Sequence, residues 1–245
     1  MSRLAVIIPY RDREAHLTKM LPHTVSFFRR NTQIEPLFVI AEQSDDKPFN
    51  RGSLINHAYN IVAGMVDYVC FHDVDYMPLW ADYTEPNLPS RIIWWGLHER
   101  PIGHGSDGYV KAQREGLAAV AVMRKWHFEA ANGFSNGYWG WGYEDTDIAK
   151  RLESVGIPIG YRDGTFQPID HDSNGFDKEG KPSQASQENA ERFATRKYPD
   201  LLDGLSSLDA DIESVEQMMC KGWADETAPL LWCKFNLGDM YAKRK

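Results

Sequence analysis

The sequence has few cysteines, no surplus of positive charge and no long apolar run. Its three cysteines, Cys70, Cys220 and Cys233, are not spaced as metal ligands, and an odd number leaves one without a disulfide partner. A formal net charge of −8 argues against a broad nucleic-acid-binding surface, because phosphates are held by clustered lysine and arginine. No run of 18 apolar residues occurs, and nothing near residue 1 resembles a signal peptide. From these absences we expect a reduced, cytoplasmic protein.

The composition is that of a folded protein with a substantial core. Of the 245 residues, 42% are hydrophobic and 25% are charged. These fractions are ordinary for a globular protein, so the composition does not predict disorder. The sequence contains no internal repeat and no linker long enough to separate two domains. A single core can serve a chain of this length, so we expect one domain spanning residues 1–245.

Buried strands alternate with amphipathic helices along the first third of the chain. Strands are expected at Leu4–Tyr10, Glu35–Gln43 and Asp67–Asp75, and a second helix at Arg51–Gly64. The helix between the first two strands is indicated by five apolar residues at helical spacing: Leu17, Met20, Leu21, Val25 and Phe28. This alternation predicts an α/β fold with a mostly parallel sheet covered on both sides.

The rest of the chain has a weaker pattern. The stretch RIIWWGLH (91–98) predicts a further strand, and residues 116–133 predict a strand that leads into a short helix. Tyr143–Gly156 predicts a helix with acids in its first turn and a glycine stop. A polar loop and an exposed helix are expected over 171–193, and small strands or turns over 200–235.

Two aspartates follow the third strand, in YVCFHDVDYMP (Tyr68–Pro78). In α/β sheets ligands bind beyond the carboxyl ends of the strands, where Asp73 and Asp75 stand. Neighbouring carboxylates repel each other unless a proton or cation lies between them, and a divalent ion held partly by a diphosphate removes that cost. By itself the pattern fits equally a capping aspartate beside a solvent-facing one.

Three arginines are expected at the same edge of the sheet. Arg11 and Arg13 follow the first strand in PYRDR, and Arg51 begins the second helix in FNRGSLIN. Guanidinium groups suit phosphates, so arginines beside aspartates indicate a site for an anionic ligand and a metal ion. The alternative is that the first two are surface arginines paired with Asp12 or Glu14.

The segment NGFSNGYWGWGYEDTDIAKRL (Asn132–Leu152) combines glycines, aromatic residues and acids. The glycines allow close backbone approach, and the aromatic residues offer flat faces of the kind that pack on sugar rings. Glu144, Asp145 and Asp147 then begin a helix, whose N-terminus stabilises a charged carboxylate and so suits a general base. The alternative is N-capping combined with aromatic core packing.

Taken together, PYRDR, FNRGSLIN, FHDVDYMP and YWGWGYEDTDIAKRL resemble the β-1,4-galactosyltransferases of glycosyltransferase family 7. The resemblance runs from Val6 to Phe235, and HDVDYMP, DGLSSL and ETAPLLWCKF are most similar to the xylose-directed branch. It implies a GT-A fold with a mostly parallel sheet flanked by helices. It also implies Mn²⁺ as cofactor, a UDP-sugar donor, inversion at the anomeric carbon and a β-1,4 linkage to an acceptor hydroxyl.

The resemblance also gives roles to individual residues. Asp145 would be the catalytic base, and Glu144 would help to hold the sugars. Asp75 and His171 would bind the metal ion. Eight further residues would line the donor site: Pro9, Arg11, Arg13, Phe49, Arg51, Asp73, Val74 and Trp141.

Three positions depart from the family's pattern. Residues 168–170 contain no methionine or histidine where the family has a second metal ligand, so Asp170 or Asp172 is the alternative. Tyr143 replaces a glycine or arginine. Gly116 stands about where galactose-specific enzymes carry a bulky aromatic residue against the C2 substituent of the sugar. A glycine would leave room for an N-acetyl group, so UDP-GalNAc is an alternative donor to UDP-galactose.

We therefore expect an inverting hexosyltransferase that acts on a saccharide or glycoconjugate acceptor, with no nucleic-acid partner. One alternative is a UDP-GalNAc-specific transferase of capsule or lipopolysaccharide synthesis, and another is a non-catalytic carbohydrate-binding protein on the same fold. Phosphotransferases with an aspartyl nucleophile fit less well. Small residues and threonine normally follow their second aspartate, whereas Tyr76, Met77 and Pro78 follow here.

Overall fold

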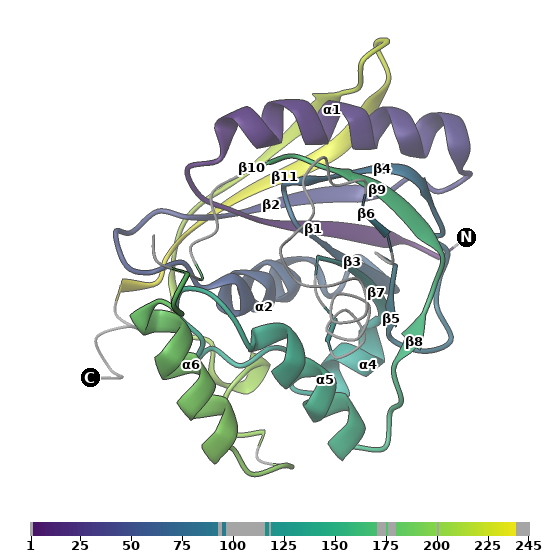
Figure 1. The fold of residues 1–245 in the computed structure, drawn as a ribbon. Coiled ribbons are helices and arrows are strands. Elements are labelled where there is room, and N and C mark those ends of the chain that lie inside the picture. The colour runs from purple at the N-terminus through teal and green to yellow at the C-terminus, as the bar shows by residue number, and fades with distance from the viewer. Residues whose placement is uncertain are drawn as a thin grey trace.

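A layer of strands lies between helices in the computed structural model of the chain (Figure 1). The structure describes residues 2–92, 95–96, 116–117, 119–170, 175, 180–199 and 201–238. Within these ranges, every helix is too short or too polar to cross a membrane.

The described residues form a main sheet of eight strands in the order β10-β11-β2-β1-β3-β7-β5-β8. The pairings β11 with β2, β2 with β1, β1 with β3 and β5 with β8 are parallel, and the other three are antiparallel. The predicted α/β fold with a mostly parallel sheet is confirmed. The strands are β1 (Leu4–Tyr10), β2 (Leu37–Gln43), β3 (Tyr68–His72), β5 (Ser90–Arg91), β7 (Val120–Arg124), β8 (Gly160–Tyr161), β10 (Asp211–Lys221) and β11 (Thr227–Asn236).

Helices pack on both faces of this sheet. α1 covers one face, while α2, α4 and α5 cover the other, and α6 lies beside α5 (Figure 1). The helices are α1 (Glu14–Asn31), α2 (Arg51–Val62), α4 (Lys125–Ala130), α5 (Glu144–Ser154) and α6 (Gln184–Thr195).

The central strand β1 is buried on both faces, as its continuous apolar run predicts. Leu4, Val6 and Ile8 belong to the core cluster beneath α1. Ala5 and Ile7 belong to the cluster that α2 covers on the opposite face. Because successive side chains of a strand point to opposite faces, one short segment contributes to both cores and fixes the position of its own carboxyl end.

α1 confirms the first predicted helix. The Phe28 ring lies 5.9 Å from that of Phe38 and 4.7 Å from that of Tyr83, measured between centroids. Aromatic contacts of this kind add to the free energy gained from burial. The buried face of α1 includes all five residues whose spacing predicted this helix: Leu17, Met20, Leu21, Val25 and Phe28.

The C-terminal segment differs from the prediction of small strands or turns. β10 and β11 form a long antiparallel hairpin, and β11 pairs in parallel with β2 to extend the main sheet. Leu231, Cys233 and Phe235 of β11 enter the core cluster on the α2 face. The pairing joins segments almost two hundred residues apart, so it depends on tertiary contacts and not on a local pattern.

A second sheet, in the order β4-β9-β6, was not predicted. The stretch RIIWWGLH does not form one strand: β5 ends at Arg91 in the main sheet, and β6 begins at Trp95 in the second. The backbone N–H of Ile169 donates to the carbonyl oxygen of Asp75 at 2.7 Å, so this sheet joins the paired aspartates to the chain before residue 171. Its strands are β4 (Tyr76–Ala81), β6 (Trp95–Gly96) and β9 (Gly164–Pro168).

Replacing Phe28 by Ala should lower the free energy of unfolding by about 3–5 kcal/mol, because it removes a buried ring and leaves a cavity under α1. Urea denaturation followed by circular dichroism measures the change. The control, Lys19→Ala on the exposed face of the same helix, should stay within about 0.5 kcal/mol of the parent. Equal effects of the two substitutions would contradict the burial of α1 described here.

Candidate active site

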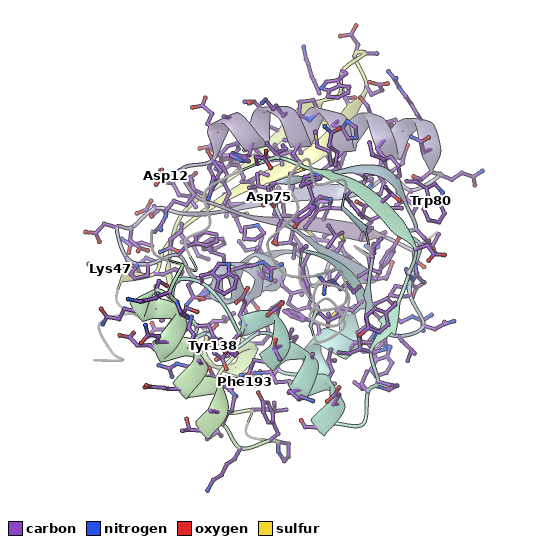
Figure 2. All side chains as sticks on the ribbon, in the orientation of Figure 1. Asp12, Lys47, Asp75, Trp80, Tyr138 and Phe193 are labelled. Atoms are coloured by element: carbon purple, nitrogen blue, oxygen red, sulfur yellow. The ribbon has the colours of Figure 1, made fainter. Side chains whose placement is uncertain are left out.

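The carboxyl ends of β1 and β3 open into a cavity of about 620 Å³. Pockets that bind small molecules usually measure roughly 300–1,000 Å³. The turns after β1 and β3, the start of α2, the loop before α5 and the N-terminus of α6 form its wall. Asp75, labelled in Figure 2, lies beneath α1 in this view. The cavity therefore occupies the edge of the sheet at which the sequence predicted a ligand site.

Ten of the twelve site residues expected from the sequence line this cavity. Asp145 is not part of the wall but follows Glu144, which is. His171 and Asp172 lie outside the described residues, so the expected metal ligand at 171 stays a prediction. The ten residues in the wall are Pro9, Arg11, Arg13, Phe49, Arg51, Asp73, Val74, Asp75, Trp141 and Glu144.

The sequence analysis missed other residues of the wall. His16 stands three residues beyond Arg13 near the start of α1, so its place could have been found from the helical period. Its Nε2 lies 3.3 Å from the carbonyl oxygen of Asp170. The α6 residues had no local signal, because tertiary packing alone brings that helix to the cavity. The missed residues are His16, Pro48, Ser183, Gln184 and Ala185, whereas Gly140 and Gly142 belong to the glycine-rich segment singled out from the sequence.

Arg51 carries a buried positive charge in the cavity wall. Asn50 caps α2 by accepting a hydrogen bond from the backbone N–H of Ser53, which places Arg51 at the first position of the helix. The Arg51 Nε donates to Asp73 Oδ1 at 2.7 Å, and its Nη1 lies 4.0 Å from Glu144 Oε1. Its Nη1 and Nη2 are buried and donate no hydrogen bond to the described residues. A buried guanidinium in this state can still donate to an anionic ligand.

Arg11 lies across the turn that follows β2. It donates to the carbonyl oxygen of Lys47, and its guanidinium carbon is 5.6 Å from the centre of the Phe49 ring. The alternative partner Asp12 is 3.9 Å from Arg11 Nε, but the Asp12 side chain is 93% exposed. An exposed pair of this kind contributes little, so backbone and ring contacts account for the position of Arg11.

Burial shifts the charge balance of the acidic residues. It raises the pKa of Asp73, and the negative charge of Asp75 adds to this effect while Arg51 opposes it. Burial, together with the charge of Asp145, raises the pKa of Glu144 to about 7. Burial works to lower the pKa of Arg51, but Asp73 and Glu144 outweigh it and the pKa is raised. One buried cation thus faces several carboxylates that it does not fully compensate.

The Asp145 carboxylate stands in the first turn of α5. The backbone N–H of Thr146 donates to its Oδ1 at 2.8 Å, while no described residue donates to Oδ2. A Cβ atom at Gly116 would lie 2.9 Å from that Oδ2, so the backbone of residue 116 packs directly against the carboxylate and a side chain there would force a shift. One carboxylate oxygen, Oδ2, is therefore left to accept a proton.

The loop before α5 is held against α6. The Asn189 side chain donates from Nδ2 to the carbonyl oxygens of Trp139 at 3.1 Å and Trp141 at 3.2 Å. Tyr143 adopts a left-handed backbone with φ of 75°, and its ring centre lies 5.4 Å from that of Phe193. Phe193 is labelled on α6 in Figure 2. A non-glycine residue at positive φ is strained, and this ring contact with α6 supports it.

A buried network of ion pairs and hydrogen bonds holds α5 in place. Arg151, fully buried, donates from Nε to Asp147 Oδ2 at 2.7 Å and from Nη2 to Asp203 Oδ1 at 2.7 Å. The Arg196 Nε lies 3.0 Å from Asp147 Oδ1, and the Tyr198 hydroxyl donates to the same atom at 2.6 Å. Buried charges are tolerated when they are paired and hydrogen-bonded in this way. The network fixes the helix whose N-terminus carries the two acids of the site.

Replacing Glu144 by Gln should stabilise the fold more at about pH 8 than at about pH 5. The folded-state pKa of about 7 lies above the ordinary glutamate pKa of 4.5, so the folded state binds more protons than the unfolded state between these values. Stability is therefore lost as the pH rises through this window, and a neutral glutamine removes the loss. The gain above pH 7 should be about 1–3 kcal/mol.

Thermal unfolding followed by calorimetry at both pH values measures this effect. The matched control is Glu153→Gln, because Glu153 is exposed in the last turn of the same helix. Its effect should not differ between the two pH values. A gain for Glu144→Gln that is independent of pH would contradict the raised pKa.

Two family models match the chain. One, described as the N-terminal region of glycosyl transferase group 7, matches residues 1–84. The other, described as the N-terminal domain of galactosyltransferase, matches residues 108–172. Together they span more than half of the chain, and they include the arginines, the paired aspartates and the acids of α5.

Curated relatives carry related names. Beta-1,4-galactosyltransferase 7 of Drosophila melanogaster is 29% identical over 225 residues, which is 89% of this chain and 65% of that protein. Beta-1,4-galactosyltransferase 4 of Cricetulus griseus is 36% identical over 157 residues, which is 62% of this chain and 43% of that protein. The chain thus spans less than two thirds of the length of these relatives.

Solved structures share the arrangement of strands and helices. The catalytic domain of Drosophila beta1,4galactosyltransferase 7, in complex with xylobiose, matches with a TM-score of 0.71 at 26% identity, over 96% of this chain and 95% of that one. GalNAc-T7 with UDP, GalNAc and Mn²⁺ matches with a TM-score of 0.55 at 12% identity, over 82% of this chain and 49% of that one, a likeness of fold alone. The predicted GT-A fold is therefore confirmed. Matching sequence models and a shared catalytic-domain fold place the chain in glycosyltransferase family 7, the family of the β-1,4-galactosyltransferases.

Proposed function

We propose that the chain transfers a hexose from a UDP-sugar to a hydroxyl of a saccharide acceptor, with inversion at the anomeric carbon and formation of a β-1,4 linkage. The observation that carries this proposal is the cavity itself. It gathers arginines, aspartates, an exposed tryptophan and the N-terminus of α5 at the carboxyl edge of the sheet. Each group has the chemistry that one part of such a reaction needs.

Arginine side chains would bind the nucleotide. Arg11, Arg13 and Arg51 line the cavity, and the Nη atoms of Arg51 donate no hydrogen bond to the described residues. Guanidinium groups recognise diphosphate oxygens in a bidentate manner. Phe49 and Pro9 add apolar surface beside them, which suits the flat face of a uracil ring.

Mn²⁺ fits the donor set of this site. Asp75 offers a carboxylate in the cavity wall, and Asp73 lies close enough for the two charges to repel each other, a cost that a cation would remove. Among the described residues no three histidine, cysteine, aspartate or glutamate side chains gather as a metal site, so the donor and His171 would complete the shell. When bound, the ion would supply charge neutralisation for the leaving diphosphate.

Asp145 would act as the base. Its Oδ2 would accept the proton of the acceptor hydroxyl as the hydroxyl oxygen attacks the anomeric carbon from the face opposite UDP. The bond between the sugar and UDP breaks in the same step. Trp141, 47% exposed in the cavity wall, would pack on a sugar ring and orient donor and acceptor, and such positioning can contribute roughly 7–11 kcal/mol.

A saccharide acceptor accords with the Drosophila relative solved with xylobiose. A carbohydrate-binding protein without activity, the alternative left open by the sequence, would bind donor and acceptor but release no UDP. Measurement of UDP release in the presence of Mn²⁺, UDP-sugar and a panel of xylosides and glucosaminides distinguishes the two. UDP release only when donor and acceptor are both present supports the transferase, and binding without release contradicts it.

Replacing Asp145 by Asn should lower kcat by about 10²–10⁴-fold, because the amide cannot accept the proton. UDP and Mn²⁺ binding, measured by isothermal titration calorimetry, should be unchanged, because Asp145 is not part of the cavity wall. Glu153→Gln, on the same helix and exposed, serves as the control with normal turnover. Near-normal kcat in the Asp145 variant would exclude this residue as the base.

With Gly116 the enzyme should accept UDP-GalNAc as donor, whereas a variant with a large side chain at this position should prefer UDP-galactose. A Cβ at Gly116 would come within 2.9 Å of Asp145 Oδ2, so a larger side chain here would crowd the carboxylate and, with it, the C2 substituent of a donor sugar bound beside it. In Gly116→Tyr the ratio of kcat/KM for UDP-GalNAc to that for UDP-galactose should fall about tenfold or more. The ratio controls for a general loss of activity. An unchanged ratio would mean that residue 116 does not contact the donor sugar.

A further inference from the structure

The outermost strand of the main sheet, β10, has a long free edge. Among the described residues its only neighbour in the sheet is β11. Ten of its eleven residues are exposed or half-buried. Four large apolar side chains are exposed on this strand: Ile212 (54%), Val215 (47%), Met218 (37%) and Met219 (59%). Proteins rarely leave so long an edge unprotected, because its free N–H and C=O groups pair readily with another strand.

The pairing of β10 with β11 fixes which backbone groups are free. The N–H of Gly222 donates to the carbonyl oxygen of Glu226 at 2.6 Å, so this pair is hydrogen-bonded within the hairpin. Hydrogen-bonded pairs alternate along an antiparallel ladder. The register therefore turns the N–H and C=O groups of Val215, Gln217 and Met219 away from β11.

A second, independent contact gives the same alternation of inward- and outward-facing backbone groups along β10. The carbonyl oxygen of Phe235 accepts a hydrogen bond from the N–H of Ser44, on the side of β11 that faces β2. The next residue back, Lys234, must then turn its backbone toward β10, where it pairs with Ser214. Between Ser214 and Lys221 the even-numbered residues of β10 thus bond to β11 and the odd-numbered residues face outward, whereas the bulge between Ile212 and Ser214 interrupts this alternation.

We infer that β10 pairs antiparallel with β10 of a second copy of this chain, about a twofold axis at Gln217. Outward-facing groups then meet at the centre, so the two Gln217 residues exchange both of their backbone hydrogen bonds. Met219 lies opposite Val215 of the second copy. Lys221 lies opposite Glu213 of the second copy, at the bulge that ends the regular ladder after Ser214.

The charges of the strand favour this register over the one centred a residue earlier. Centring the axis one residue earlier, at Glu216, would place the two Glu216 carboxylates directly opposite each other, which is destabilising. Centring it at Gln217 sets two lysines against two glutamates and two methionines against two valines. The same surface serves both copies, as a twofold interface requires. This self-complementarity of charge and apolar contact identifies the occupant of the edge as a second copy of the chain.

The interface is small and lies apart from the cavity. A single pair of strands buries less surface than a standard interface of roughly 1,600 Å², so the dimer should form in a concentration-dependent manner in the micromolar range or above. No residue of β10 lines the cavity. The inference therefore stands independently of the proposed function, and its disruption should leave turnover unchanged.

Gln217→Pro tests the pairing by sedimentation velocity over a concentration series. Proline removes the outward N–H without removing a bond to β11. The two lost intermolecular hydrogen bonds should raise the dimer dissociation constant roughly tenfold or more. Gln217→Thr keeps the N–H and is the matched control. A parent protein that stays monomeric at submillimolar concentration, or a folded Gln217→Pro that dimerises like the parent, overturns the inference.

A charge exchange tests the register without proline. Lys221→Glu should weaken the dimer, because it sets like charges opposite each other at both ends of the interface. Adding Glu213→Lys to the same chain should restore the parent dissociation constant, because the pair is reformed with its signs reversed. Failure of the double variant to recover the dimer would overturn the register centred at Gln217. Thermal unfolding of each variant confirms that the hairpin is intact.

Discussion

The ion pairs of the buried Arg51 guanidinium are the interaction on which the site depends. One side of this group bonds Asp73, and the other approaches Glu144 across the cavity. It therefore joins the turn after β3 to the N-terminus of α5. Because burial still raises the pKa of both acids, the compensation is incomplete. A site left with surplus negative charge is prepared to take up a cation together with an anionic donor.

The two walls of the cavity are built in different ways. The wall that carries Arg11 and Asp73 follows directly from strands buried on both faces, so the sheet fixes its geometry. The opposite wall comes from a loop and two helices, and it is held by side chains to backbone carbonyls and by the buried ions around Arg151. The groups proposed to hold the nucleotide thus directly follow rigid strands. The opposite wall depends on polar contacts that stay strong only while water is excluded.

Much of the fold and most of the candidate site could be predicted from local patterns. β1 and α1 could be predicted from an apolar run and from helical spacing. The residues that follow parallel strands meet at one edge of the sheet, so the place of the site could be predicted as well. The prediction of small strands or turns near the C-terminus was wrong, because β10 and β11 form a long hairpin with each other and β11 also pairs with the distant strand β2. The α6 residues of the wall were missed for the same reason. Their side chains have no unusual chemistry, and only packing places them there.

The sequence by itself determined which chemical groups are available and at which strand ends they stand, because strand direction and helical period are local properties. Only the tertiary structure decided that Arg51 reaches both Asp73 and Glu144, that Gly116 stands against the Asp145 carboxylate, and that β10 is an outer strand of the sheet within the described part of the chain. These contacts join distant segments, and their energies depend on burial that no short stretch encodes. Local sequence patterns therefore indicate which residues belong to the site. The packing of the chain, which excludes water, sets the distances between these residues and their charge states.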